Sequence, residues 1–268
     1  MIYDIHTKYA AQQTLQQLTG IQTELWIENL YKERDYPLQD DFVATMIQEY
    51  GTEKLPESYE DMQFVFFHIT TSANQCSSIL KYGLLDLQES YRCKESELRT
   101  FLNTHGVYID LDDNFLSYNG HRFDIRYGVC PRNHSSIEYK CWSVGRKFYY
   151  DYTVCGFLSA WEASPYGGQV HRRPEILWDI DNLLGTQLSK EWEQSHIAYK
   201  IVARVNGNDI CYPYDDDSSD EEKLMAYLVM AYNEAFNGNS ENILLMKNNI
   251  QIPSKDILAI ELLDMWSL

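Results

Sequence analysis

The sequence has little cysteine, no long apolar run and few basic residues. Six cysteines in 268 residues are too few for a disulfide framework, so we expect free thiols in a reducing compartment. The longest apolar runs span a few residues, such as 64–67, far short of the ~20 that a membrane span needs. The N-terminus lacks the charged-then-apolar pattern of a signal peptide. We therefore predict a cytoplasmic protein without a membrane partner.

Basic residues are outnumbered: 22 Lys and Arg stand against 40 Asp and Glu, a formal net charge of −18. Non-specific coating of DNA needs an excess of basic residues, so this class of protein is excluded. The deficit is not uniform, because residues 121–147 contain Arg122, Arg126, Arg132, Lys140, Arg146 and Lys147 against Asp124 and Glu138. This segment predicts a positive surface for a pyrophosphate or an acceptor phosphate. Ordinary surface salt bridges are the alternative.

Aromatic and apolar residues are plentiful. They make up 14% and 44% of the chain, with 21 tyrosines, which excludes an intrinsically disordered chain. Residues 9–31 and 39–50 have helix-favouring composition and apolar stripes, and Gly51 marks a stop. We predict an N-terminal helical segment over 1–62, followed by a single domain over 63–268.

The pattern changes at residue 64. The run FVFFHIT predicts a buried strand, and residues 73–82 predict a short helix that ends at Gly83. Further strands are predicted at 106–110, 137–144, 149–158, 175–180, 198–205 and 257–263. A helix is predicted over 221–236, opened by a capping box at Ser218 or Ser219. Strands joined mostly by loops favour a mixed or antiparallel α+β domain.

Three short motifs occur in order along these predicted strands. They are His68-Ile69-Thr70, then Tyr108 in Gly-Val-Tyr, then Glu175 after Arg-Arg-Pro. This order resembles the ADP-ribosyltransferase superfamily, in the His–Tyr–Glu branch of diphtheria-toxin-like enzymes and poly(ADP-ribose) polymerases. Residues 67–85 also resemble the first motif of the DarT-type toxins, which modify nucleic acids. The resemblance covers roughly 64–205 and implies two packed sheets, antiparallel or mixed.

The resemblance implies a role for each motif residue. Glu175 would stabilise the oxocarbenium-like transition state of NAD cleavage. His68 and Thr70 would contact ribose hydroxyls, and Tyr108 would stack on nicotinamide. The backbone of Ile69 would grip the nicotinamide amide, although many members of the family have glycine there.

Two further residues are candidates for binding NAD. Tyr118 follows Tyr108 at the distance of a second stacking tyrosine in the polymerases. Arg173 stands two residues before Glu175, where many protein-modifying members have Glu or Gln, and its guanidinium suits a phosphate or a carboxylate. Taken singly, each motif residue has an ordinary alternative: a core histidine, a packed strand tyrosine and a surface carboxylate.

The function predicted from the sequence is NAD-dependent transfer of ADP-ribose to a macromolecule, either nucleic acid or protein. A bacterial or phage toxin or defence enzyme, with an antitoxin or immunity protein as partner, fits this chemistry. NAD hydrolysis by water, a catalytically silent nucleotide- or protein-binding module, and chance motifs on an interaction protein are the alternatives. No metal is predicted, because the zinc-like set lacks paired Cys-x2-Cys spacing; it comprises Cys130, His134, Cys141 and Cys155.

Overall fold

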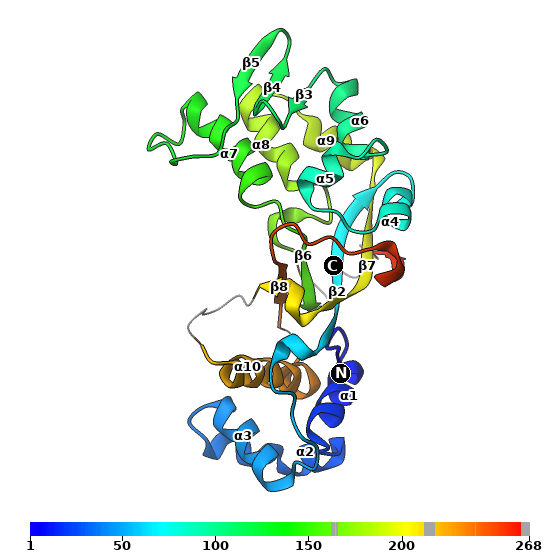
Figure 1. Ribbon diagram of the computed structural model, residues 1–268, viewed down its shortest axis with the longest axis vertical. Helices are drawn as coiled ribbons and strands as arrows, with labels where there is room; N and C mark the ends of the chain where they lie inside the picture. The colour runs from blue at the N-terminus through cyan, green and yellow to red at the C-terminus, as the bar shows by residue number, and fades with distance from the viewer. Residues whose placement is uncertain (162–163, 165, 212–217, 239, 264–268) are drawn as a thin grey trace.

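A computed structural model describes residues 1–161, 164, 166–211, 218–238 and 240–263. The fold is mixed α+β, as the sequence predicts, with one large sheet at the middle of an elongated molecule (Figure 1). The large sheet has the order β10–β7–β2–β6–β9–β8, with antiparallel neighbours, and β1 pairs with β2 in parallel. Its strands are β1 (Ile2–Tyr3), β2 (Gln63–Ser72), β6 (Cys155–Ser159), β7 (Ile197–Asn206), β8 (Ile210–Cys211), β9 (Asn242–Met246) and β10 (Ile257–Leu262).

Helices cover both ends of this sheet (Figure 1). At one end lie α1 (Lys8–Thr19), α2 (Thr23–Asn29), α3 (Gln39–Tyr50) and α10 (Asp220–Tyr232). Beside and beyond the other end lie α4 (Ser77–Tyr82), α5 (Leu87–Arg92), α6 (Glu97–Thr104), α7 (Ile137–Tyr149), α8 (Glu175–Leu184) and α9 (Leu188–Ser195). The same end holds a second sheet of β3 (Tyr108–Asp110), β4 (Phe115–Tyr118) and β5 (His121–Asp124).

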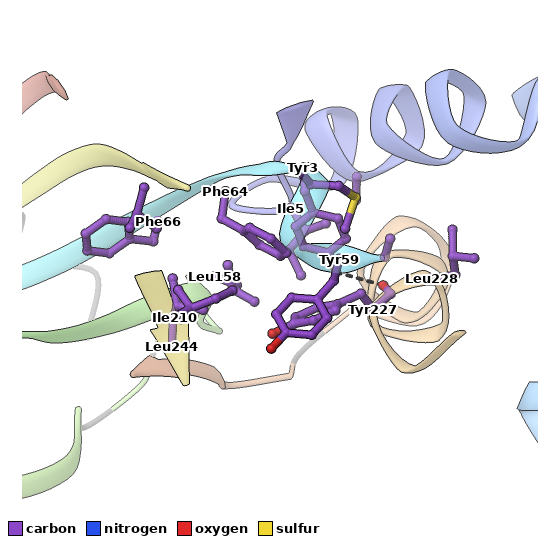
Figure 2. Packing of buried hydrophobic residues seen from close by; sticks show 14 of the residues in the cluster. Tyr3, Ile5, Tyr59, Phe64, Phe66, Leu158, Ile210, Tyr227, Leu228 and Leu244 are labelled. Carbon is purple, nitrogen blue, oxygen red and sulfur yellow. Dashed lines mark hydrogen bonds between the residues drawn. The ribbon is translucent and has the colours of Figure 1, made fainter. Parts of the chain in front are cut away.

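The largest apolar core joins the two ends of the chain. Phe64 and Phe66 of β2 are fully buried and belong to one cluster with the N-terminal helices and α10 (Figure 2). The hydroxyl of Tyr3 donates a hydrogen bond of 2.8 Å to the carbonyl of Tyr227, across 224 positions of sequence. The segment 1–62 thus packs on the sheet and on α10 through shared apolar surface, which stabilises both. Its separation from 63–268 as a domain stays a prediction.

The opposite face of β2 carries a smaller core. Strand alternation sends Val65, Phe67 and Ile69 away from Phe64 and Phe66. These three pack in a separate buried cluster that includes Phe157 of β6 and Tyr166. The sheet therefore has two covered faces, and the face of Phe67 looks toward the loop that follows β6.

Two predicted strands are wrong. Residues 137–144 and 175–180 lie in helices α7 and α8. The buried positions of α8 are Ile176, Leu177, Ile180 and Leu183, which recur every three or four residues as on a helix. Pro174 precedes α8 and fits a helix start. Each helix begins with a few residues that also favour strands. The apolar spacing over the whole segment is that of a helix, and it decides the structure.

Other boundaries follow the sequence closely. The strands predicted at 64–70, 198–205 and 257–263 correspond to β2, β7 and β10. Gly20, at φ 74°, separates α1 from α2 within the helix-favouring stretch 9–31, at the glycine that interrupts its apolar stripe. Gly83 ends α4 at φ 87°, and a Cβ there would lie 1.9 Å from the carbonyl oxygen of Ile252. Glycine is thus required by both conformation and space.

The capping box of α10 offers a stability prediction. The Ser219 hydroxyl accepts from the Glu222 N–H at 3.2 Å, and the Glu222 carboxylate accepts from the Ser219 N–H at 2.7 Å. We expect Ser219→Ala to lower the free energy of unfolding by about 0.5–2 kcal/mol, measured by urea denaturation. Ser218→Ala is the matched control and leaves it unchanged. Equal losses in the two variants would contradict this assignment of the cap.

Candidate functional site

His68 lies half-buried in the middle of β2. Its Nδ1 is 2.7 Å from the carbonyl oxygen of Cys155, which only accepts, so Nδ1 carries the proton. Burial lowers the pKa of His68, and the hydrogen bond to Cys155 only partly opposes this. Alternation along β2 places His68 and Thr70 on the face of Phe66. His68 is therefore a neutral imidazole anchored to the neighbouring strand.

The half-buried state of His68 predicts a pH dependence. Its folded-state pKa lies below the ordinary value of 6.5, so protonation of His68 favours the unfolded chain. The free energy of unfolding therefore keeps its full value above that pH and falls as the pH is lowered. Between about pH 7.5 and 5.5 we expect the free energy of unfolding to drop more steeply in the wild type than in His68→Gln. The exposed His121, changed to Gln, is the control. Equal slopes for wild type and His68→Gln would contradict this assignment.

Tyr108 and Tyr118 lie on the small sheet. The Tyr108 side chain is 54% exposed and lines an open pocket of about 490 Å³ with Arg92, Arg99 and Asp110. Tyr118 packs on the apolar core formed by helices α5 to α9. Among the hydrogen bonds, ion pairs and ring contacts of the described residues, none joins Tyr108 to residues 68–70 or to Glu175.

Glu175 begins α8 rather than a strand. Its Oε2 is 2.6 Å from the Lys147 Nζ, which is also 2.6 Å from Oδ2 of Asp151. Burial works to lower the pKa of Lys147, but its two carboxylate partners outweigh this and raise it. A Cβ at Gly168 would lie 1.6 Å from Oε1 of Glu175, so this second oxygen is packed against the loop. The charge of Glu175 is thus compensated by a buried lysine.

Cys155 is an exposed residue of β6; its backbone carbonyl contacts His68, and its thiol interacts electrostatically with Asp151, Glu175 and Lys147. The pKa of this thiol is raised to about 11, first by loss of hydration around the sulfur and then by the two carboxylates, while Lys147 lowers it. A thiol with this pKa is a poor nucleophile near neutral pH. The arrangement around Cys155 therefore brings two motif residues into one neighbourhood without creating a reactive cysteine.

Arg173 and Ile69 serve the packing of the protein. The Arg173 side chain is 9% exposed; it donates to the Gly168 carbonyl at 3.3 Å and lies 3.6 Å from Glu193 and 5.2 Å from the Trp178 ring centroid. These contacts hold the loop before α8 in place. Ile69 is buried opposite Lys200 of β7, within the smaller core.

A carboxylate that the sequence motifs missed lies at the end of a strand of the large sheet. Glu241 is exposed and directly precedes β9, which pairs with β6, the strand next to β2. It accepts a hydrogen bond from the hydroxyl of Ser164, and that fully buried hydroxyl accepts from the Tyr166 N–H at 3.1 Å. Burial raises the pKa of Tyr166, and the charge of Glu241 raises it further. These contacts place Glu241 on the face of Phe67.

The chain on either side of Glu241 is fixed by a second set of hydrogen bonds. Ser159 of β6 donates to the Ser240 carbonyl at 3.2 Å and accepts from the Asn242 amide at 2.8 Å. The signal in the sequence is a Glu before the apolar run NILLM. The strand at 242–246 is not among those that the sequence predicts, so the carboxylate before it has no motif to mark it.

The described part of the chain holds no group of three or more His, Cys, Asp or Glu arranged to bind a metal ion. Within the same residues, no helix is both long and apolar enough to cross a membrane. No family model, curated protein or solved structure matches the chain.

Proposed function

We propose that the protein cleaves NAD and transfers ADP-ribose to a macromolecule, and that Glu241 rather than Glu175 is the carboxylate of the reaction. The observation that carries the proposal is an exposed carboxylate directly before a strand of the sheet, held by a hydrogen bond from a buried serine. No ion pair within the described residues involves Glu241, whereas Glu175 is paired with Lys147. The resemblance implies a carboxylate on a strand; Glu241 directly precedes strand β9, whereas Glu175 lies on helix α8.

The chemistry follows from the charge that develops when nicotinamide departs. The bond between ribose C1′ and nicotinamide breaks with its electron pair going to nicotinamide, and the ribose becomes oxocarbenium-like. A carboxylate that keeps its full negative charge beside this centre lowers the barrier. The hydrogen bond from Ser164 orients one oxygen of Glu241 and leaves the other to face the sugar. The negative charge of Glu175 is already balanced by the ammonium of Lys147, so Glu175 would stabilise the positive charge on ribose much less.

An exposed aromatic residue is linked through its backbone to Ser164, the partner of Glu241. The Trp161 side chain is 43% exposed, and its carbonyl accepts from the Ser164 N–H at 3.0 Å. A flat, exposed indole suits stacking against nicotinamide or adenine. In this proposal Trp161 takes the stacking role that the resemblance implies for Tyr108. Alternation along β2 directs His68 to the other face, so we assign it no part in breaking the bond.

The test of the proposed function is incubation of the purified protein with NAD labelled in its adenylate part. We expect release of nicotinamide and label on nucleic acid or protein from a mixture of acceptors. Nicotinamide release with free labelled ADP-ribose alone would overturn transfer in favour of hydrolysis. NAD binding without release of nicotinamide would indicate a silent module, and neither binding nor release would reject the NAD site altogether.

A further inference from the structure

Five aromatic rings form a continuous row along α7, and none of them belongs to the three buried apolar clusters. Consecutive members are His134, Tyr139, Trp142, Tyr127 and Tyr150, which we call the aromatic ladder. Ring centroids are 4.4, 5.6, 6.0 and 5.3 Å apart in this order, with interplanar angles of 22°, 29°, 31° and 22°. These near-parallel, offset rings cover only part of one another's faces. The ladder begins in the loop before α7 and ends at the residue after that helix; Figure 1 shows α7 and this loop.

Three of the five rings of the ladder are exposed, and Tyr139 and Trp142 are half-buried. Tyr127 and Tyr150 are 39% and 65% exposed, and His134 is also exposed. The Trp142 indole donates to the Gly128 carbonyl at 2.9 Å, which ties the loop to the helix. Exposing the apolar faces of these rings to water is unfavourable, and a cluster of exposed apolar surface commonly marks a binding site.

Positive charge accompanies the rings. Arg132 stands two positions before His134 in the sequence, Lys140 lines a pocket with His134 and Tyr139, and Arg146 lies 5.9 Å from the ring centroid of Trp142. The ion pairs found within the described residues use none of these three cations. The other basic residues of 121–147 are paired: Arg122 with Asp113, Arg126 with Asp124, and Lys147 with Asp151 and Glu175. The local positive excess predicted from the sequence is therefore concentrated on the ladder.

A pocket of about 530 Å³ opens beside the ladder between α7 and α8. Tyr139 and Lys140 line it from α7, and Trp178 and Asn182 line it from α8. Asp179 also lines it; burial raises its pKa, and nearby cations, Arg146 among them, lower it. The pocket combines flat rings, a cation and an amide able to pair with the edge of a base.

We propose that the aromatic ladder binds a single-stranded nucleic acid, with bases stacked on the exposed rings and phosphates contacting Arg132, Lys140 and Arg146. Rows of aromatic rings beside cations are how proteins hold single strands without reading sequence. Duplex bases are already stacked on each other and cannot use the rings. Binding of the strand does not depend on the proposed NAD chemistry. A role for the bound strand as the acceptor of ADP-ribose rests on the proposed function.

The test is fluorescence anisotropy without NAD, using labelled single strands of about 12 nucleotides, within the length range that such surfaces cover. Oligothymidylate and oligouridylate identify whether DNA or RNA is preferred. An abasic strand of equal length keeps the phosphates and removes the bases. We expect the wild type to bind at least one of the base-bearing strands more tightly than the abasic strand and a duplex.

Variants separate stacking from fold and charge. We expect Tyr150→Leu and Tyr127→Leu each to weaken binding by about tenfold, as loss of a stacked base predicts, while Tyr150→Phe and Tyr127→Phe keep it. Tyr31→Leu, at a tyrosine 62% exposed on the opposite end of the molecule, is the control. Arg132→Gln should lower the dependence of log affinity on log salt by about 0.7.

Three results would overturn the ladder proposal: no binding of either base-bearing strand, equal binding of the abasic strand, or wild-type affinity in both leucine variants. Equal binding of the abasic strand would indicate a polyanion or acidic-protein surface instead. Because NAD is absent from these measurements, their failure leaves the proposed cleavage of NAD untouched. Conversely, binding of single strands without cleavage of NAD would support the ladder proposal and contradict the proposed enzymatic function.

Discussion

Replacing Glu241 with glutamine is expected to lower kcat for nicotinamide release by about 100-fold or more while KM changes a few-fold, because removing one fixed electrostatic contact commonly costs about 10²–10³ in kcat. Glutamine has the same shape, and its carbonyl oxygen still accepts the hydrogen bond from Ser164. What it lacks is the negative charge that opposes the growing positive charge on ribose. The measurement is chromatographic quantitation of nicotinamide over a range of NAD concentrations.

Glu175→Gln is the matched control for this experiment. It makes the same chemical change at the carboxylate that the sequence motif indicated, but that carboxylate is paired with Lys147 at 2.6 Å. We expect turnover within a few-fold of the wild type, and a lower thermal midpoint because a buried ammonium loses one of its two partners. The opposite result, with Glu175→Gln inactive and Glu241→Gln active, would show that Glu175 is the carboxylate of the reaction and that Glu241 is not.

Phe64→Ala is expected to lower the free energy of unfolding by about 3–5 kcal/mol, the usual cost of emptying a core phenylalanine site. Phe64 is fully buried, and its ring centroid lies 4.9 Å from those of both Tyr3 and Tyr227. The cavity would therefore open where the N-terminal segment, the central sheet and α10 meet (Figure 2). Urea denaturation followed by circular dichroism measures the loss.

The same variant tests how the N-terminal segment is coupled to the rest. We expect helix loss and the fluorescence change of buried Trp26 to coincide in one transition, because Trp26 belongs to the same core as Phe64. The exposed Tyr31, changed to Ala, should shift stability by less than about 0.5 kcal/mol. Two separated transitions, with the segment 1–62 melting apart from the sheet, would contradict a shared core.

Local patterns explain which elements were predictable from the sequence. β2 and β7 are long runs of β-branched and aromatic residues, and α10 begins with a serine and an acidic capping residue, so type and position follow from a few neighbours. α7 and α8 begin with residues that also suit strands. Their helical period appears only when Cys141, Val144 and Phe148, or Ile176, Ile180 and Leu183, are read together.

The candidate site was less predictable because its contacts are distant in sequence. Ser164 and Glu241 are 77 positions apart, and no short motif includes both. The His–Tyr–Glu order selects residues by type and spacing, yet Tyr108 lies on a different sheet and Glu175 on a helix. The aromatic ladder was visible only as a local basic excess, since the stacking of Tyr127 on Tyr150 depends on how the loop folds back along α7.

The most direct measurement of the central claim is nicotinamide release from NAD by purified wild-type protein, with Glu241→Gln and Glu175→Gln assayed in parallel and the oligonucleotides of the ladder experiment present as acceptors. Our account predicts release by the wild type and by Glu175→Gln, and near-complete loss in Glu241→Gln. Absence of release from the wild type, or equal release by the wild type and Glu241→Gln, would contradict it.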